Sequence, residues 1–141
     1  GARRAFYVPS DSFGGLSPER RGALSMKNLL TMCAVRIVLA QLEGSGRGAL
    51  GSFNPEACAT LYTQLEEMPM KDGDEWVRAL MRKDRLLALR LLEVRAAYAE
   101  EGFEWDSLRA CALQEVGKAN IALLREGAEG MLGPEPPPAD K

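Results

Sequence analysis

The hydrophobic pattern between Met26 and Leu42 predicts a helix that is apolar on more than one side. The only charged residues in this stretch are Lys27 and Arg36. One stripe at helical spacing consists of Leu30, Ala34, Ile37 and Gln41. A second stripe, on a different side of the helix, consists of Ser25, Leu29, Met32 and Arg36. Because a surface helix buries one stripe and exposes the rest to water, we expect one side to serve the fold and the other to meet a second subunit or a bound peptide.

Capping residues and helix breakers divide the rest of the chain into helices. Ser17-Pro18 and Asn54-Pro55 are typical helix starts, since Ser and Asn accept a hydrogen bond from the first turn and Pro fits its first position. Asp72-Gly73-Asp74-Glu75 has the form of a capping box. The expected helices cover about residues 18–43, 55–67, 73–81, 82–101 and 107–126. No stretch alternates with the period of two that indicates a strand, so the predicted fold class is all-α, with about five helices per subunit.

Segments rich in Gly and Pro mark the limits of the folded region. We expect residues 1–16 to be a flexible N-terminal arm, residues 17–132 to form the helical domain, and residues 133–141, with four prolines, to be a disordered tail. The basic arm fits the end of a transit peptide. Residues 44–53 are expected to be a glycine-rich loop. This loop contains Gly46-x-Gly48-x-x-Gly51, but no strand precedes the motif, so we interpret it as a linker rather than a dinucleotide site.

Composition excludes several classes of function. The chain has 141 residues, a net charge of −2 and no histidine. It therefore lacks the commonest general base and metal ligand, and it is not a dedicated nucleic-acid binder. Its three cysteines, Cys33, Cys58 and Cys111, have no metal-binding spacing and are expected to be small core side chains in a reducing compartment. The apolar helix is interrupted too often by polar residues to span a membrane. We expect no cofactor and no metal.

Basic residues are concentrated between Trp76 and Arg95. This stretch contains only two acids, Asp84 and Glu93. It contains six basic residues, namely Arg78, Arg82, Lys83, Arg85, Arg90 and Arg95. The first interpretation of such a cluster is a solvated helix face with ordinary ion pairs. The second is a basic ridge that binds an acidic protein surface.

One enzyme hypothesis arises from the first helix. Leu29-Leu30, Arg36 and Leu39-Ala40 resemble the first helix of the helical chorismate mutases, which are all-α dimers with Arg-lined sites. Those enzymes need several converging basic groups, including a Lys soon after this helix, whereas here the helix runs into Glu43 and a glycine loop. An all-helical dimeric small-molecule enzyme of this type is one alternative. A helical scaffold that uses its apolar face only to dimerise is another.

Five segments resemble the RbcX family of Rubisco assembly chaperones. In chain order they are Ala34–Glu43, Asn54–Ala57, Asp72–Asp74, Leu87–Arg95 and Phe103–Asp106. The first resembles the signature of the family's first helix, and the second resembles the start of its second helix. The next two are similar to its third and fourth helices, and the last is similar to the plastid, type II branch of plants and green algae. The resemblance extends from about Ser17 to Glu126 in the family's order.

The resemblance implies a non-enzymatic, all-helical, arc-shaped homodimer that uses no ATP, metal or other cofactor. A central groove at the dimer interface is expected to bind the C-terminal tail of the Rubisco large subunit, and the edges of the arc to contact the body of that subunit. The dimer would hold two large subunits together during assembly of the octameric core and leave when small subunits bind. Its compartment would be the chloroplast stroma, with neither nucleic acid nor membrane as a partner.

The resemblance also assigns site residues to the groove and to the edges. The groove-lining positions are Ser25, Leu29, Met32, Met70 and Lys71, and the edge positions are Gln41, Arg90 and Arg125. Family members usually carry aromatic residues, often Tyr, where this chain has Leu29 and Met32, and an amide where it has Lys71. The groove is therefore expected to be less rigid and to offer fewer hydroxyl donors, while flexible Met suits a surface that binds peptides.

Overall fold

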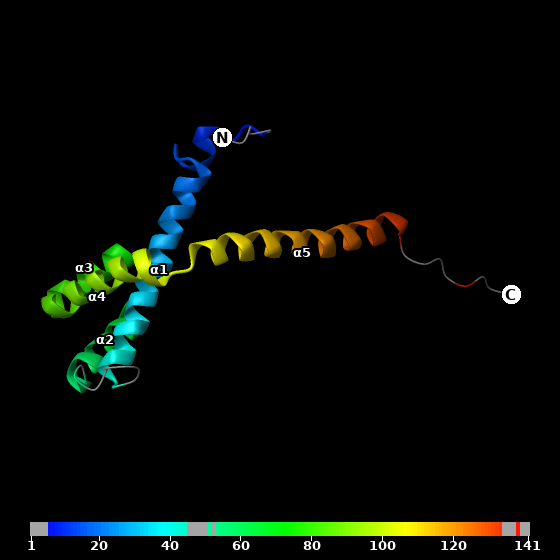
Figure 1. Ribbon diagram of the computed structural model, residues 1–141. Helices are drawn as coiled ribbons and strands as arrows, with labels where there is room; N and C mark the ends of the chain where they lie inside the picture. The colour runs from blue at the N-terminus through cyan, green and yellow to red at the C-terminus, as the bar shows by residue number, and fades with distance from the viewer. Residues whose placement is uncertain (1–5, 45–50, 52, 134–137, 139–141) are drawn as a thin grey trace. The chain divides into compact units, whose positions relative to one another are not determined.

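The structure of the protein is a computed structural model, which describes residues 6–44, 51, 53–133 and 138. The α-helices in these ranges are α1 (Pro18–Leu42), α2 (Pro55–Glu67), α3 (Gly73–Lys83), α4 (Arg85–Ala97) and α5 (Trp105–Leu132) (Figure 1). A 3-10 turn, η1 (Ser10–Phe13), precedes them, and a π-helical turn, η3 (Tyr98–Gly102), follows α4. The described ranges contain no strand, which confirms the predicted all-α class. The chain divides into two compact units, residues 1–102 and residues 103–141.

The first unit is built around the C-terminal half of α1. Helices α2, α3 and α4 lie beside this half (Figure 1), and the buried residues of α1 run from Leu30 to Leu42. Every residue of α1 before Leu30 is at least partly exposed. The core combines side chains of four helices, among them Val35, Val38, Leu39, Leu42, Leu61, Trp76, Val77, Leu80, Leu87 and Leu91. The start of α1 therefore extends beyond the packed core.

Two stripes of α1 differ in burial, as the hydrophobic pattern predicts. Leu30 and Ala34 of the first stripe are buried, while its other two members are half-buried. The core side of α1 is broader than this stripe, because Val35 and Val38 beside it are fully buried. In the second stripe, Leu29 and its neighbours stay accessible, so this side of α1 takes little part in the packing of its own unit.

Helix α1 is long and apolar, as a membrane-spanning helix is. Among the described residues, the segment Asp11–Leu42 has the length and composition to cross a membrane. The core helix of a globular protein has the same properties. Seven residues of α1 are buried against the other helices of the unit. The core and the accessible second stripe together account for the apolar character of α1.

The helix starts follow the predicted caps. The side chains of Ser17 and Asn54 accept hydrogen bonds from the third residue after each, at 3.0 and 3.1 Å. Asp72 accepts from the backbone N–H groups of Asp74 and Glu75. The carboxylate of Glu75 forms an ion pair with Arg78. Asp72 thus supplies the cap of α3, and no bond from Glu75 back to Asp72 is present, as a complete capping box would require.

A single residue, Asp84, separates α3 from α4. Its backbone N–H donates to the carbonyl of Leu80 at 2.8 Å, which ends α3. Its side chain accepts from the backbone N–H of Leu87 at 3.1 Å, which caps α4. The sequence pattern predicted the boundary two residues earlier, because Arg82 and Lys83 fit either helix.

Helices α1 and α3 come close together at Gly73. A Cβ atom at this position would lie 2.7 Å from Oγ1 of Thr31. Because real side chains do not tolerate so short a contact, only glycine lets α3 begin directly against α1. The amide N–H of Gly73 also donates to Oδ1 of Asn28 at 2.9 Å, so a side chain of α1 satisfies one of the first N–H groups of α3.

The predicted arm, loop and tail are described only in part. Residues 1–5 of the arm, 45–50 and 52 of the glycine-rich loop, and most of the tail lie outside the described residues, as do Gly46 and Gly48 of the glycine motif. The described part of the predicted flexible arm contains η1, which is followed by Gly14 and Gly15 with positive φ. The ends of the loop are close together, since the N–H of Asn54 donates to the carbonyl of Leu42.

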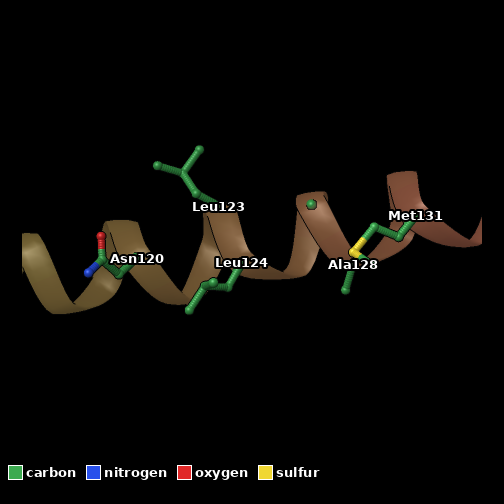
Figure 2. A pocket seen from close by; sticks show the side chains of 6 residues that line it. Asn120, Leu123, Leu124, Ala128 and Met131 are labelled. Carbon is green, nitrogen blue, oxygen red and sulfur yellow. The ribbon is translucent and has the colours of Figure 1, made fainter.

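The second unit consists of α5 and its flanking residues. Helix α5 has 28 residues and extends beyond the predicted range at both ends. At its C-terminal end it continues through Gly127 and Gly130. None of its residues is buried. Leu113, Leu124 and Met131 recur on one side at spacings close to whole turns. An open pocket on this helix is lined by Asn120, Leu123, Leu124, Gly127, Ala128 and Met131 (Figure 2). Helix α5 thus presents an apolar side that no described residue of its own unit covers.

Candidate functional site

The accessible side of α1 carries three of the predicted groove residues. Ser25 and Leu29 are exposed, and Met32 is half-buried. The side chain of Leu29 is 48% exposed, a large fraction for a leucine in the middle of a long helix. Because these residues lie three or four positions apart, they share one face of the helix. This face is the first part of the candidate site.

The segment that leads into α3 carries the other two groove residues. Met70 is half-buried and packs against the core, while Lys71 is exposed. Two residues after Lys71, the amide of Gly73 is bonded to Asn28 of α1. Asn28 directly precedes Leu29, so the structure brings the start of α3 to the turns of α1 that carry the accessible face.

A polar network joins the first turn of α3 to α1 and α4, and we call it the Asp74 network. It consists of Lys27, Thr31, Asp74 and Arg95. One carboxylate oxygen of Asp74 accepts from Arg95 at 2.7 Å, and the other pairs with Lys27 at 2.9 Å. Arg95 also donates to the hydroxyl of Thr31 at 3.1 Å, and this hydroxyl donates to the carbonyl of Lys27 at 2.8 Å. Three helices, α1, α3 and α4, therefore meet at one carboxylate.

The charged partners change the acidity of Asp74. The hydrogen bond from Arg95, followed by that from Lys27, holds the pKa of this carboxyl below its usual value of 3.8. Partial burial acts in the opposite direction but is outweighed. Asp74 is therefore ionised throughout the physiological pH range, and the network stays charged.

We expect Asp74 to make the stability of the protein depend on pH in the acidic range. Its pKa is lower in the folded than in the unfolded protein, so its contribution is complete above the unfolded value and is lost as the pH falls through the folded value. Between about pH 5 and pH 2, the free energy of unfolding should fall more steeply for the wild type than for Asp74→Asn. Urea denaturation at several pH values measures how the free energy of unfolding changes with pH in both proteins. Equal pH dependence would mean that the ion pairs of Asp74 do not form in solution.

Two of the predicted edge residues contact each other. Arg90 of α4 donates to Oε1 of Gln41 on α1 at 2.6 Å, and both side chains are half-buried. The third, Arg125, is exposed on α5 and belongs to the second unit. The structure thus joins Gln41 and Arg90 into one polar feature of the first unit.

The basic cluster between Trp76 and Arg95 follows the first of its two interpretations. Four of its six members have partners: Arg78 pairs with Glu75, Lys83 with Glu67, Arg90 with Gln41, and Arg95 with Asp74. In the part of the chain that the structure describes, Arg82 and Arg85 have none. A continuous basic ridge is therefore not present.

The cysteines occupy different environments. Cys58 is buried and lies 3.7 Å from a carboxylate oxygen of Glu43, which also accepts from the hydroxyl of Tyr62. Burial, with the charge of Glu43, raises the pKa of the Cys58 thiol. Cys33 is half-buried and Cys111 is exposed. The prediction of three core cysteines is wrong for Cys111, because α5 has no core of its own. The described residues include no cluster of three or more potential metal ligands.

Comparison with known proteins decides the family. The protein family described as RbcX protein matches residues 19–132. The chain belongs to the RbcX family. It is 42% identical, over 123 residues, to the chaperonin-like RBCX protein 1, chloroplastic, of Arabidopsis thaliana. This match covers 85% of the chain but 65% of the relative, so the chain spans slightly less than two-thirds of that relative's length.

Solved RbcX structures agree with the fold. RbcX-IIa of Chlamydomonas reinhardtii is 45% identical, with a TM-score of 0.65 over 86% of this chain and 99% of that one. A second structure of RbcX-IIa, in complex with the RbcL C-terminal tail, is 46% identical, with a TM-score of 0.63 over 78% and 96% of the two chains. The Arabidopsis relative is named chaperonin-like, so family membership gives no support to the chorismate-mutase alternative.

The resemblance to RbcX did not reveal the Asp74 network. Local sequence patterns placed Asp74 in the first turn of α3 and Arg95 in the basic cluster. Neither assignment links the two residues, because they lie 21 positions apart on different helices. The first turn of α3 carries two acids, Asp74 and Glu75, and no local pattern indicates which of them pairs with a distant basic residue.

Proposed function

We propose that this protein is a Rubisco assembly chaperone that binds the C-terminal tail of the Rubisco large subunit. The observation that carries the proposal is its 46% identity to an RbcX whose structure was solved with that tail bound. The tail lies along the α1 face of Ser25, Leu29 and Met32, beside Met70 and Lys71. The protein catalyses no reaction and needs no ATP, metal or other cofactor.

The chemistry of the face suits an extended peptide with apolar anchors. Leu29 and Met32 offer accessible apolar surface, and flexible Met adapts to side chains of different shape. The exposed ammonium of Lys71 favours acidic side chains or a terminal carboxylate nearby. Burial of one large anchor contributes about 2–3 kcal/mol, so two or three anchors give roughly micromolar affinity after the costs of association. Weak binding of this kind suits a factor that small subunits must displace.

The active form in this proposal is a homodimer in the chloroplast stroma. Helix α5 supports it, because exposed Leu113, Val116 and Leu124 would be covered by a second copy. The groove forms where two α1 faces meet, within an arc whose edges carry Gln41, Arg90 and Arg125 and contact the body of the large subunit. Residues 17–132 act together as the chaperone domain. The compartment rests on the name of the Arabidopsis relative, which is chloroplastic.

Calorimetric titration with a synthetic peptide tests the proposal. The peptide has the C-terminal sequence of the Rubisco large subunit. The expected result is micromolar binding with one peptide per dimer, and no binding of a peptide with the same residues in scrambled order. Absence of binding to a well-folded dimer would contradict the proposed function. Turnover of chorismate would instead revive the enzyme hypothesis.

Substitution of Arg90 separates the edge from the groove. We expect Arg90→Ala to leave tail-peptide affinity unchanged but to lower the yield of assembled Rubisco in a chaperonin-based reconstitution, since the contact surface for the large-subunit body loses a charge and Gln41 loses its partner. Arg85→Ala is the matched control, because it removes an exposed charge from the same helix without breaking a hydrogen bond. A normal yield with Arg90→Ala would contradict the edge assignment.

A further inference from the structure

The two parts of the proposed peptide site come from different helices, and polar contacts join these helices next to the site. On α1, the network residues Lys27 and Thr31 alternate with the site residues Leu29 and Met32 within two turns. On the other side, Met70 and Lys71 precede the anchored Gly73 by three and two residues. A displacement of the start of α3 would therefore move one part of the site relative to the other.

The position of α3 as a whole does not depend on these contacts. Trp76, Val77 and Leu80 are almost completely buried and hold the helix in the core. The indole N–H of Trp76 also donates to the carbonyl of Met68 at 2.9 Å. Partly exposed ion pairs such as those of Asp74 contribute little to stability. Their geometric effect is larger, because two oxygens of one carboxylate are held by cations from two other helices.

We propose that the Asp74 network is a positioning device that sets the separation and orientation of the two parts of the peptide site. Asp74, Lys27, Thr31 and Arg95 do not contact the tail in this proposal. They keep the segment from Met70 to Gly73 beside Leu29 and Met32, so that the site is formed before the peptide arrives. A preformed site binds more tightly, because the peptide does not have to order it. This inference rests on the proposed function, since it concerns the same peptide site.

Asp74→Asn tests the inference with little change of volume. The amide removes the charge and presents donors to Lys27 or Arg95, so it cannot satisfy both cations. We expect the affinity of the large-subunit tail peptide, measured by calorimetry, to fall about tenfold. Arg95→Lys, which keeps the charge but has a single donor group, should lose less affinity than Arg95→Gln.

Glu67→Gln is the matched control. It breaks the ion pair of Glu67 with Lys83, which joins α2 to the other end of α3 at 2.6 Å. We expect this variant to bind the peptide within about twofold of the wild type. Urea denaturation of all variants accounts for differences in overall stability. Unchanged affinity in Asp74→Asn, or an equal loss in Glu67→Gln, would overturn the inference.

Amide hydrogen exchange separates this inference from the proposed function. In the free protein, Asp74→Asn should accelerate exchange of the Gly73 amide, which donates to Asn28, while amides in the middle of α3 keep their protection. If the wild-type protein does not bind the tail, the proposed function fails. In that case, unchanged exchange of the Gly73 amide in Asp74→Asn would overturn the positioning role as well. Faster exchange of this amide would show that the Asp74 network still positions the start of α3, and the site would then serve another peptide.

Discussion

Substitution of Leu29 by aspartate should abolish binding of the large-subunit tail and leave the fold intact. The side chain is about half exposed, so the carboxylate can stay in water in the free protein. In the complex the same carboxylate would be covered by the peptide. Loss of apolar contact and burial of an unpaired charge together cost at least about 3 kcal/mol, which corresponds to roughly a hundredfold loss of affinity. Calorimetry with the tail peptide measures this loss.

The control for Leu29→Asp makes the same substitution elsewhere in the same unit. Leu86 on α4 is 79% exposed, and Leu86→Asp introduces an identical charge away from the α1 face. We expect this variant to bind the peptide like the wild type. Met32→Asp should behave like Leu29→Asp, with some additional loss of stability, because Met32 is half-buried. Normal binding by both α1 variants would mean that the tail binds elsewhere.

The second large effect concerns α5 and the dimer. The double substitution of Leu113 and Leu124 by aspartate should convert the proposed dimer into a monomer. These residues lie eleven positions apart, or about three full turns, so they face the same side of α5. A carboxylate buried in an apolar interface costs several kcal/mol, and two of them would weaken association by more than about a thousandfold. Sedimentation equilibrium should then give a mass of 15.4 kDa instead of twice this value.

Ala122→Asp provides the control for the α5 variant. Ala122 is exposed and lies about 180° from Leu113 around the helix. The variant adds a charge to the opposite side of α5 and should remain dimeric. Circular dichroism of each variant shows whether α5 itself stays helical. A dimer that survives both aspartates would place the interface on another surface of the chain.

Local signals allowed most of the fold to be predicted. The caps Ser17, Asn54 and Asp72 act within three residues of themselves, so the sequence alone indicates where α1, α2 and α3 begin. The predicted end of α5, at about Glu126, falls short of its observed end at Leu132, and the helix continues through Gly127. A glycine costs a helix only about 1 kcal/mol relative to alanine, and the residues around Gly127 are good helix formers.

The candidate site could be predicted only in part, because local signals do not specify contacts between residues far apart in the sequence. The accessible face of α1 follows from periodicity, which a single helix displays in its own sequence. The contacts that bring α3 to this face join residues far apart, such as Thr31 and Arg95, which are separated by 64 positions. No local pattern specifies such a pair. The pairing depends on how the helices pack, and packing in turn depends on details such as the absence of a side chain at Gly73.

The junction at Asp84 has a consequence for how proteins of this kind can diverge. One residue ends α3 through its backbone and starts α4 through its side chain. An inserted or deleted residue between Leu80 and Leu87 would remove one of these functions and rotate α4 by about 100° relative to α3. Leu87 and Leu91 would then leave the core. Natural variation in length should therefore be absent from this corner and should accumulate between α1 and α2, where a longer connection costs little.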